Sequence, residues 1–523
     1  TLLDPQTGHY SAEIPVPTGM LLDPSIQTGA ANTLGSFNST AGSIRWGWAP
    51  VYEGGKILLG FSQHDGNTQE LQGGVGIAED SWGGQWLVDG NFSHSQGDGD
   101  LDYADHQFHR YAGRIQRASA TTQTDFFAGY QHKVFGLQNL YAAPYDSYEK
   151  EDVETQLYLL NHRYTPDDDQ WIELTGYYRY NKDDYDFNRF SPDSGNPFQH
   201  DTNVGGGAVK GAQPVGDYQL IYGAEVYTES IDSTSLTYGP YDSQVLGSVS
   251  LAGRRSWETD SGVWTALLGA NWDDSNHFEG ELLPVSRLEF QQIDEVGDGW
   301  NVYADASGAS QVPGYTAVAS SPSGGIFRGN SSLGRETSWS FSLGGGVDEG
   351  PWSLDAATFA RRDDNLSDWT YQADSGAART ANPIDLWVYG LELISQYGWD
   401  SGSLSVGYAW LEKDEDYGST EVDASFYALN YPEHRVTFTL QWDLTTWLAL
   451  QTDTEWRLQR ENLLRESNDT ALLTDLALRF QTQAIPGAEL WIGVWNLWDD
   501  DFQEVPGVPR EGQTFFANLA YRF

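Results

Sequence analysis

The sequence is short of several kinds of residue on which other protein classes depend. It has no cysteine and one methionine in 523 residues, so disulfides and thiol chemistry play no part. Its 28 basic residues stand against 75 acidic ones, a formal net charge of −47 that argues against a nucleic-acid partner. No apolar run approaches the roughly 18–20 residues of a membrane helix. No nucleophile-elbow, zinc-protease or phosphate-loop motif occurs, so we predict that the chain is not an enzyme.

What the chain does have is aromatic residues and glycine. Trp, Tyr and Phe make up 14% of it, and glycine occurs 57 times. Aromatic girdles and glycine-containing turns are typical of transmembrane β-barrels. Without a spanning helix, a membrane location requires a closed barrel, because an open sheet would leave backbone groups unpaired in lipid. The acidic groups would then line the lumen and loops, either as an adaptation to a salty medium or to attract cations.

A period of two residues recurs from about Gly54 to Phe523. In residues 431–443 one face is apolar and the other is polar, as expected for a strand with one side in lipid and one in water. The apolar face carries His434, Val436, Phe438, Leu440 and Trp442. The same pattern occurs in residues 170–181 and 336–347.

The connections between these segments alternate between short turns and long polar loops. Short ones lie at 165–169, 214–217, 260–262 and 400–402, and long ones at 184–201, 312–335, 365–387 and 416–430. This asymmetry is typical of outer-membrane barrels, which have periplasmic turns and extracellular loops.

Counting strands back from the closing segment Gly512–Phe523 gives about 22, an even number. We therefore predict an all-β fold, an antiparallel transmembrane barrel of about 22 strands over residues 54–523. Residues 1–53 do not follow the barrel period and are predicted to form a separate piece.

Four segments resemble the TonB-dependent outer-membrane receptors. The closing hairpin is similar through Asn496–Asp499, Val505–Pro509, Gly512–Phe516 and Tyr521–Phe523, although Gln513 stands where the family usually has Arg. Three further segments resemble strand starts of the family: Phe327–Thr337, in which Ser331 and Arg335 replace two prolines, Asn382–Glu392, and Tyr431–Arg435. The resemblance implies a multi-pass protein of the Gram-negative outer membrane, surrounded by lipid and lipopolysaccharide.

By this resemblance, residues 1–53 correspond to the last part of the plug domain that fills the barrel. Most of that plug and the TonB box are not in the sequence. Three explanations fit: the chain is part of a longer one, the rest of the plug is a separate polypeptide, or gating has been lost. The partners implied are the TonB energy complex, reached through the missing plug N-terminus, and either a separate plug or a surface lipoprotein.

One acidic loop suggests a cation site. Asp98, Asp100, Asp102 and Asp105 alternate in a glycine-containing segment, and such carboxylates can wrap Ca²⁺. Some cobalamin receptors of the family bind calcium in an equivalent loop, but a solvated loop is the simpler interpretation. His94, His106 and His109 lie nearby, and Asp105, His106 and His109 could offer a transition-metal site. No cofactor is required by the sequence.

Aromatic residues in the long loops are candidate ligand contacts, with the interface girdle as the alternative. They are Tyr141, Tyr145, Tyr315, Phe327, Trp369 and Tyr371. The main functional hypothesis is TonB-dependent active uptake of a scarce, bulky nutrient of the siderophore, cobalamin or glycan class. The alternative is a structural or partner-filled barrel of an outer-membrane complex without active uptake.

Overall fold

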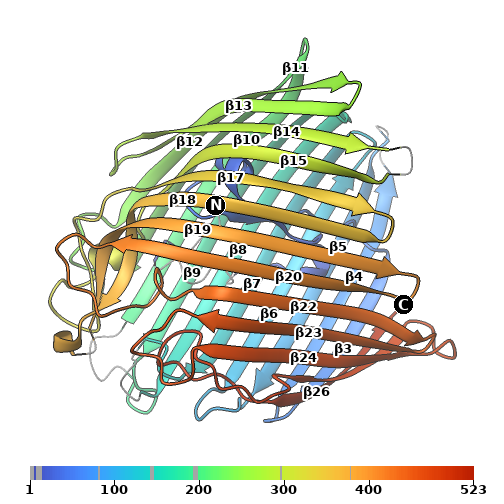
Figure 1. The fold of residues 1–523 in the computed structure, drawn as a ribbon. Helices are drawn as coiled ribbons and strands as arrows, with labels where there is room; N and C mark the ends of the chain where they lie inside the picture. The colour runs from blue at the N-terminus through green and yellow to red at the C-terminus, as the bar shows by residue number, and fades with distance from the viewer. Residues whose placement is uncertain are drawn as a thin grey trace.

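A closed antiparallel barrel dominates the computed structural model, which describes residues 5–6, 14–79, 83–141, 147–192, 198–294, 297–376 and 378–523. Within these residues, 22 long strands pair in sequence order, and the last long strand pairs with the first (Figure 1). The predicted fold class and strand number are therefore confirmed. None of the described helices is both long and apolar enough to cross a membrane.

The strands are long, and at one end of the barrel consecutive strands are joined by short turns. Their bounds are β3 (Gly54–Ser62), β4 (Asn67–Glu79), β5 (Gln85–Gly97), β6 (His106–Ala118), β7 (Thr122–Leu137), β8 (Glu149–Asp167), β9 (Gln170–Asp186), β10 (Phe198–Val215), β11 (Tyr218–Ser233), β12 (Ser243–Thr259), β13 (Gly262–Ser275), β14 (Glu281–Ile293), β15 (Gly299–Gln311), β17 (Glu336–Glu349), β18 (Trp352–Tyr371), β19 (Arg379–Trp399), β20 (Gly402–Asp416), β22 (Pro432–Thr445), β23 (Leu448–Gln459), β24 (Thr470–Gln481), β25 (Ala488–Trp495) and β26 (Thr514–Arg522).

The two faces of the strands separate apolar from polar side chains, as the sequence predicted. Phe341 and Leu343 point outward and are exposed, whereas Ser338 on the other face is buried. On β22 the outward Trp442 is likewise exposed. The outer surface is thus the apolar one, which suits a surface that lies in lipid.

The turns at one end of the barrel are short and use glycine where the backbone requires it. Gly216 and Gly350 adopt φ values of +62° and +57° in the turns after β10 and β17. This backbone conformation is unfavourable for residues other than glycine. At the opposite end the connections are long, and they contain α2 (Tyr315–Ala319), η3 (Ala373–Ser375) and the short strands β16 (Phe327–Arg328) and β21 (Ala424–Ser425).

One predicted loop is largely strand. Residues 365–387 were expected to connect two barrel strands, but β18 and β19 continue as a paired hairpin to Tyr371 and Arg379. A register shift between Asp363 and Leu366 separates this extension from the barrel, and Asn365 there has φ +58°. The extension has no apolar face toward lipid, so the alternation that identifies the other strands is missing from it.

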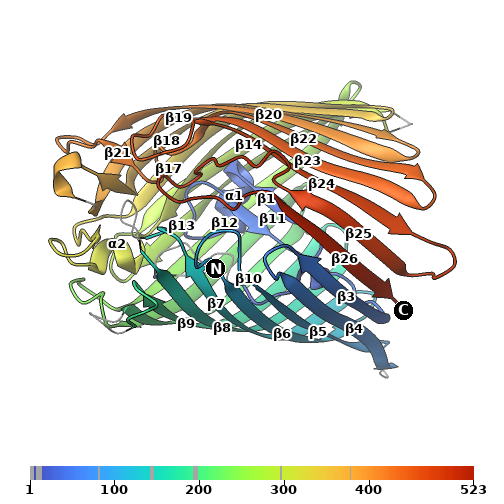
Figure 2. The ribbon, with the colours of Figure 1, turned by 90° about the horizontal axis from the view of Figure 1, so that it is seen from below.

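The N-terminal elements that the structure describes lie inside the barrel (Figure 2). They form η2 (Thr18–Met20), β1 (Ser25–Gln27), α1 (Gly29–Gly35) and β2 (Ser43–Arg45), of which β1 and β2 pair. The Thr33 hydroxyl donates to the Gly308 carbonyl at 2.8 Å, and Lys210 Nζ donates to the Gly35 carbonyl at 2.8 Å. Contacts of α1 with β13, β14, β15 and β17 fix the segment on one side of the lumen.

The barrel closes at a seam between β26 and β3. Their pairing runs from Phe516 opposite Ser62 to Arg522 opposite Lys56. Beyond it, the backbones of Gly55 and Phe523 exchange two hydrogen bonds, of 2.8 and 3.0 Å. A Cβ at position 55 would lie 2.4 Å from the Phe523 ring, so a larger residue there would displace that ring.

Candidate ligand-binding site

A cavity of about 1810 Å³ lies in the lumen between the N-terminal segment and the long-loop end of the barrel. Its wall combines residues 35–48 of that segment, inward side chains of β8 to β11, and residues of the long loops. Ligand pockets are commonly about 300–1,000 Å³, so this cavity has room for a bulky ligand.

Three of the predicted aromatic residues come together on its wall. Tyr141, Phe327 and Trp369 belong to three different loops or hairpins, and all three line the cavity. The ring centroids of Tyr141 and Phe327 are 6.0 Å apart, and those of Phe327 and Trp369 are 5.1 Å apart at 90°. Such edge-to-face pairs stabilise one another and form a rigid apolar wall.

The other predicted aromatic residues have different places. Tyr315 in α2 is buried, with its ring 5.8 Å from that of Tyr241, and its burial raises the pKa of its hydroxyl. Tyr371 packs against the hydrophobic cluster that contains Trp369. These two residues support the wall from behind, while Tyr145 lies outside the described residues.

The sequence analysis missed further aromatic residues of the same wall. Tyr185 lies 5.3 Å from Tyr141 and 5.6 Å from Phe198, measured between ring centroids. Tyr185 and Phe198 fall within the predicted loop 184–201, but the structure places them on β9 and β10. Strand parity offered a signal for Tyr185, because Tyr178 on the same strand is exposed on the outer face and the odd-numbered Tyr185 therefore belongs on the inner one.

A buried arginine stiffens this aromatic wall. The Arg379 guanidinium lies 3.9 Å from the ring centroid of Phe426 and 5.3 Å from that of Phe327. Its Nη1 donates to the Leu140 carbonyl at 3.3 Å. Cation–π contacts of a desolvated guanidinium contribute about 2 kcal/mol, so Arg379 holds together segments that are far apart in sequence.

Charged side chains complete the cavity lining. Lys210 Nζ lies 3.7 Å from a carboxylate oxygen of Glu225, and an Arg45 nitrogen lies 3.8 Å from Glu173. Further carboxylates on the wall belong to Glu151, Asp183 and Glu336. The wall therefore offers aromatic faces for stacking and charged groups for hydrogen bonding, an arrangement suited to binding.

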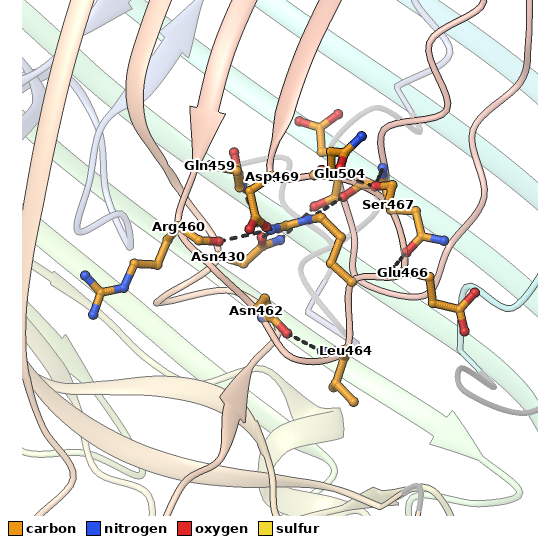
Figure 3. Close-up of polar contacts among 12 residues, drawn as sticks. Asn430, Gln459, Arg460, Asn462, Leu464, Glu466, Ser467, Asp469 and Glu504 are labelled. Carbon is orange, nitrogen blue, oxygen red and sulfur yellow. Dashed lines mark hydrogen bonds and ion pairs between the residues drawn. The ribbon is translucent and has the colours of Figure 1, made fainter.

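A network of polar contacts braces the long loops beside the cavity (Figure 3). The fully buried side chain of Arg465 donates to the Gln503 and Arg460 carbonyls, both at 3.0 Å, and to Asn430 Oδ1 at 2.6 Å. It also forms an ion pair with Asp469 at 2.5 Å. Three loops are thereby tied together, and all these bonds lie within the protein, so we assign this cluster a structural role.

The predicted calcium loop connects β5 and β6 at the long-loop end. Asp105 accepts from Arg189 Nη2 at 2.9 Å, and the hydrogen bonds from Arg189 hold the pKa of its carboxyl below the usual value. Asp100 accepts from the Gly512 backbone at 2.9 Å and lies 3.2 Å from His64 Nε2. Two of the four carboxylates thus bind parts of the protein. The calcium site at Asp98, Asp100, Asp102 and Asp105 stays a prediction.

The predicted histidine ligands His106 and His109 lie on opposite faces of β6 and do not converge. His106 faces the lumen and contacts Ser95 Oγ at 3.0 Å, whereas His94 and His109 lie together on the outer face of β5 and β6. In the described part of the chain, no three side chains of the His, Asp and Glu types are arranged to hold a metal ion.

Comparisons with known proteins agree with this architecture. The sequence pattern of the family described as "TonB dependent receptor-like, beta-barrel" matches residues 89–497. A search of curated proteins finds no match.

Several solved structures share the fold at low sequence identity. The siderophore receptor PirA from Pseudomonas aeruginosa is 16% identical, with a TM-score of 0.70 over 97% of this chain and 88% of that one. An FrpB iron transporter from Neisseria meningitidis is 12% identical, with a TM-score of 0.75 over 97% and 88%. The copper transporter OprC is 14% identical, with a TM-score of 0.73 over 96% and 85%.

The family match covers most of the chain, and the closed barrel of 22 strands accords with it. In such proteins the long loops are extracellular and the short turns periplasmic. The chain belongs to the TonB-dependent receptors, a family of transporters and receptors, and is a β-barrel of the outer membrane.

Proposed function

We propose that the protein is a receptor for TonB-dependent active uptake of a scarce, bulky nutrient, captured in the lumenal cavity. The observation that carries the proposal is the convergence of Tyr141, Phe327 and Trp369 on a cavity of about 1810 Å³. A ligand larger than the usual pocket content fits this volume, and rigid aromatic faces contribute binding energy at little cost in conformational entropy. The substrate classes considered are siderophores, cobalamin and glycans.

The N-terminal residues would then act as the tail of the plug. Residues 14–53 bind the inner wall and form the floor of the cavity, so displacement of this segment would open the lumen below a bound ligand. A pull by the inner-membrane energy complex, transmitted through TonB, supplies the work in this proposal. The neighbouring solved structures include proteins named as siderophore receptors and iron and copper transporters, which favours the same role.

Uptake of labelled ligands by cells expressing the protein tests this proposal. Ferric siderophores, cobalamin and oligosaccharides are offered to strains with and without TonB. We expect one class to be accumulated only in the TonB-containing strain, and Tyr141→Ala to lower its binding at least about tenfold, the loss of roughly 1.4 kcal/mol. Phe190→Ala is the matched control, because its ring is exposed but does not line the cavity.

Two results would contradict the proposal. Accumulation that is the same without TonB would exclude active uptake. Absence of binding for every class, in cells where the barrel is correctly inserted, would favour the alternative of a structural or partner-filled barrel.

A further inference from the structure

A row of histidines crosses three neighbouring strands on the outer surface of the barrel. His94 on β5 is paired in register with His109 on β6, which in turn is paired with His132 on β7. Strand parity places all three on the outward face, because the buried Asp89, Arg114 and Asp125 lie on the inward face of the same strands.

The row lies just beyond the aromatic girdle. Two residues closer to the middle of the barrel, Phe92, Tyr111 and Tyr130 form a row of their own, with ring centroids 5.3 and 6.2 Å apart. Girdle aromatics mark the boundary between lipid and water. The histidines therefore face the polar layer on the extracellular side, where ions can reach them.

His94 and His109 are held unusually close. Their Nδ1 atoms are 3.1 Å apart, while the rings stack at 22° with centroids 4.4 Å apart. The contact has the geometry of a hydrogen bond, in which one Nδ1 carries a proton and the other offers a lone pair. A metal ion that replaced this proton would find two imidazole nitrogens already 3.1 Å apart.

Acceptors lie beside both ring nitrogens of His94. Gln96 Oε1 is 3.2 Å from Nε2 and favours a proton there, whereas the carbonyl oxygen of Phe108 is 3.1 Å from Nδ1 and favours the other tautomer. With the proton on Nε2, His94 Nδ1 and the Phe108 carbonyl oxygen would both be free to donate electron pairs to a cation.

The distances match the needs of a transition metal. At metal–nitrogen bonds of 2.0–2.1 Å, two nitrogens in a tetrahedral site are about 3.4 Å apart. The observed 3.1 Å is close to this value, and the half-buried rings would turn out of their stacked arrangement to direct both lone pairs at one ion. Imidazole nitrogen suits Zn²⁺, Cu²⁺ and Ni²⁺ rather than Ca²⁺ or Mg²⁺.

The next histidine in the row is already oriented. His132 Nε2 lies 2.7 Å from Asp152 Oδ1, the type of carboxylate contact that commonly fixes the ring of a metal-bound histidine through its second nitrogen. This contact leaves Nδ1 of His132 as the free coordinating atom on the strand beside His109. His132 can therefore serve as a third ligand after a side-chain rearrangement.

We propose that His94 and His109 form a binding site for a divalent transition-metal ion on the outer surface of the barrel, with His132 as the adjacent third ligand. The remaining positions would be filled by the Phe108 carbonyl or by water. This site lies outside the lumen and is independent of the proposed uptake function. It would hold a single ion at the extracellular boundary of the membrane.

Equilibrium dialysis of the whole protein in detergent micelles, with zinc measured by elemental analysis, tests the proposal. A large excess of Mg²⁺ in the buffer saturates the many carboxylates. We expect one Zn²⁺ per chain, with His94→Gln and His109→Gln each weakening binding at least about tenfold. His132→Gln is expected to have a smaller effect of the same sign.

His162→Gln is the matched control, because this outward histidine contacts Thr124 Oγ1 at 2.8 Å near the short-turn end of the barrel. Electron paramagnetic resonance of bound Cu²⁺ provides a second readout: hyperfine coupling to two or more imidazole nitrogens is expected, and it should be lost in the His94→Gln/His109→Gln variant. Zinc binding that persists unchanged in that double variant, or no binding to the unmodified protein at micromolar zinc, would overturn the proposal.

Discussion

The two sides of the lumen wall are built from strands of the same kind, but their inward charged side chains differ in exposure. On the side covered by the N-terminal segment, the ion pair of Arg114 with Asp89 is 0% and 5% exposed. On the side of β22 to β26, the pair of Arg479 with Asp443 is 29% and 56% exposed. Both pairs connect inward residues of the barrel wall. The buried pair therefore stabilises the fold, whereas the exposed pair belongs to a hydrated surface.

On the covered side, each buried charge needs a partner of opposite charge. Arg114 donates to both carboxylate oxygens of Asp89, at 2.9 and 2.6 Å, and its guanidinium lies 5.1 Å from the ring centroid of Trp48 in the N-terminal segment. Desolvating a charge costs several kcal/mol unless a partner compensates it. The charges on this side therefore have to match, whereas those on the open side remain hydrated.

The strongest test of this difference is Arg114→Met. Removing the guanidinium leaves the buried carboxylate of Asp89 uncompensated, so we expect a loss of about 3–5 kcal/mol in stability. Thermal unfolding followed by tryptophan fluorescence measures it. In the double variant Arg114→Met/Asp89→Leu part of the loss should be recovered, because the buried Asp125, 3.9 Å from Arg114, still lacks its cation. Equal destabilisation by both variants would show that the pair with Asp89 is not the cause.

Cysteine labelling gives a second, smaller contrast. Because the sequence has no cysteine, a single one can be placed at Thr33, which is buried under the covered wall, or at Gln441, which is exposed on the open wall. A water-soluble maleimide should react about 10–100-fold more slowly at position 33, because labelling there requires local opening. Equal rates would mean that the N-terminal segment does not rest stably on the wall.

The smallest effect is expected for Arg479→Met on the open wall. Exposed ion pairs contribute about 0–1 kcal/mol, so the unfolding temperature should change little. The same thermal assay applies as for Arg114→Met. A loss as large as the one expected for that variant would show that the open wall is covered in the folded protein, and the contrast between the two sides would disappear.

The barrel could be predicted because its physical requirement is local. Lipid outside and water inside impose a two-residue period, which is visible in Phe341, Leu343 and Ser338 without any tertiary information. The extension of β18 and β19 beyond residue 364 could not be predicted in this way. Both of its faces lie outside the bilayer, and so no alternation marks it.

The candidate site depends on the register between strands and on the closure of the barrel. Neither can be derived from the sequence pattern alone. Tyr141, Phe327 and Trp369 were predicted as loop aromatics, but only the curvature of the whole barrel brings such distant positions together. No sequence pattern marked Arg379 as part of the site, because its aromatic partners come from other segments of the chain. The pairing of His94 with His109 requires a register accurate to one residue, and strand boundaries estimated from sequence are less certain than that.

The seam at Gly55 and Phe523 also bears on how the molecule is made. It joins strands that lie at opposite ends of the barrel sequence, so every other strand can find its neighbour before these two meet. Until then the growing sheet has two open edges, each a template for pairing with another chain. Ring closure is thus the natural last step of assembly. A chain with a substitution that prevents pairing of β3 with β26 would remain an open sheet, and it would need a chaperone to avoid aggregation.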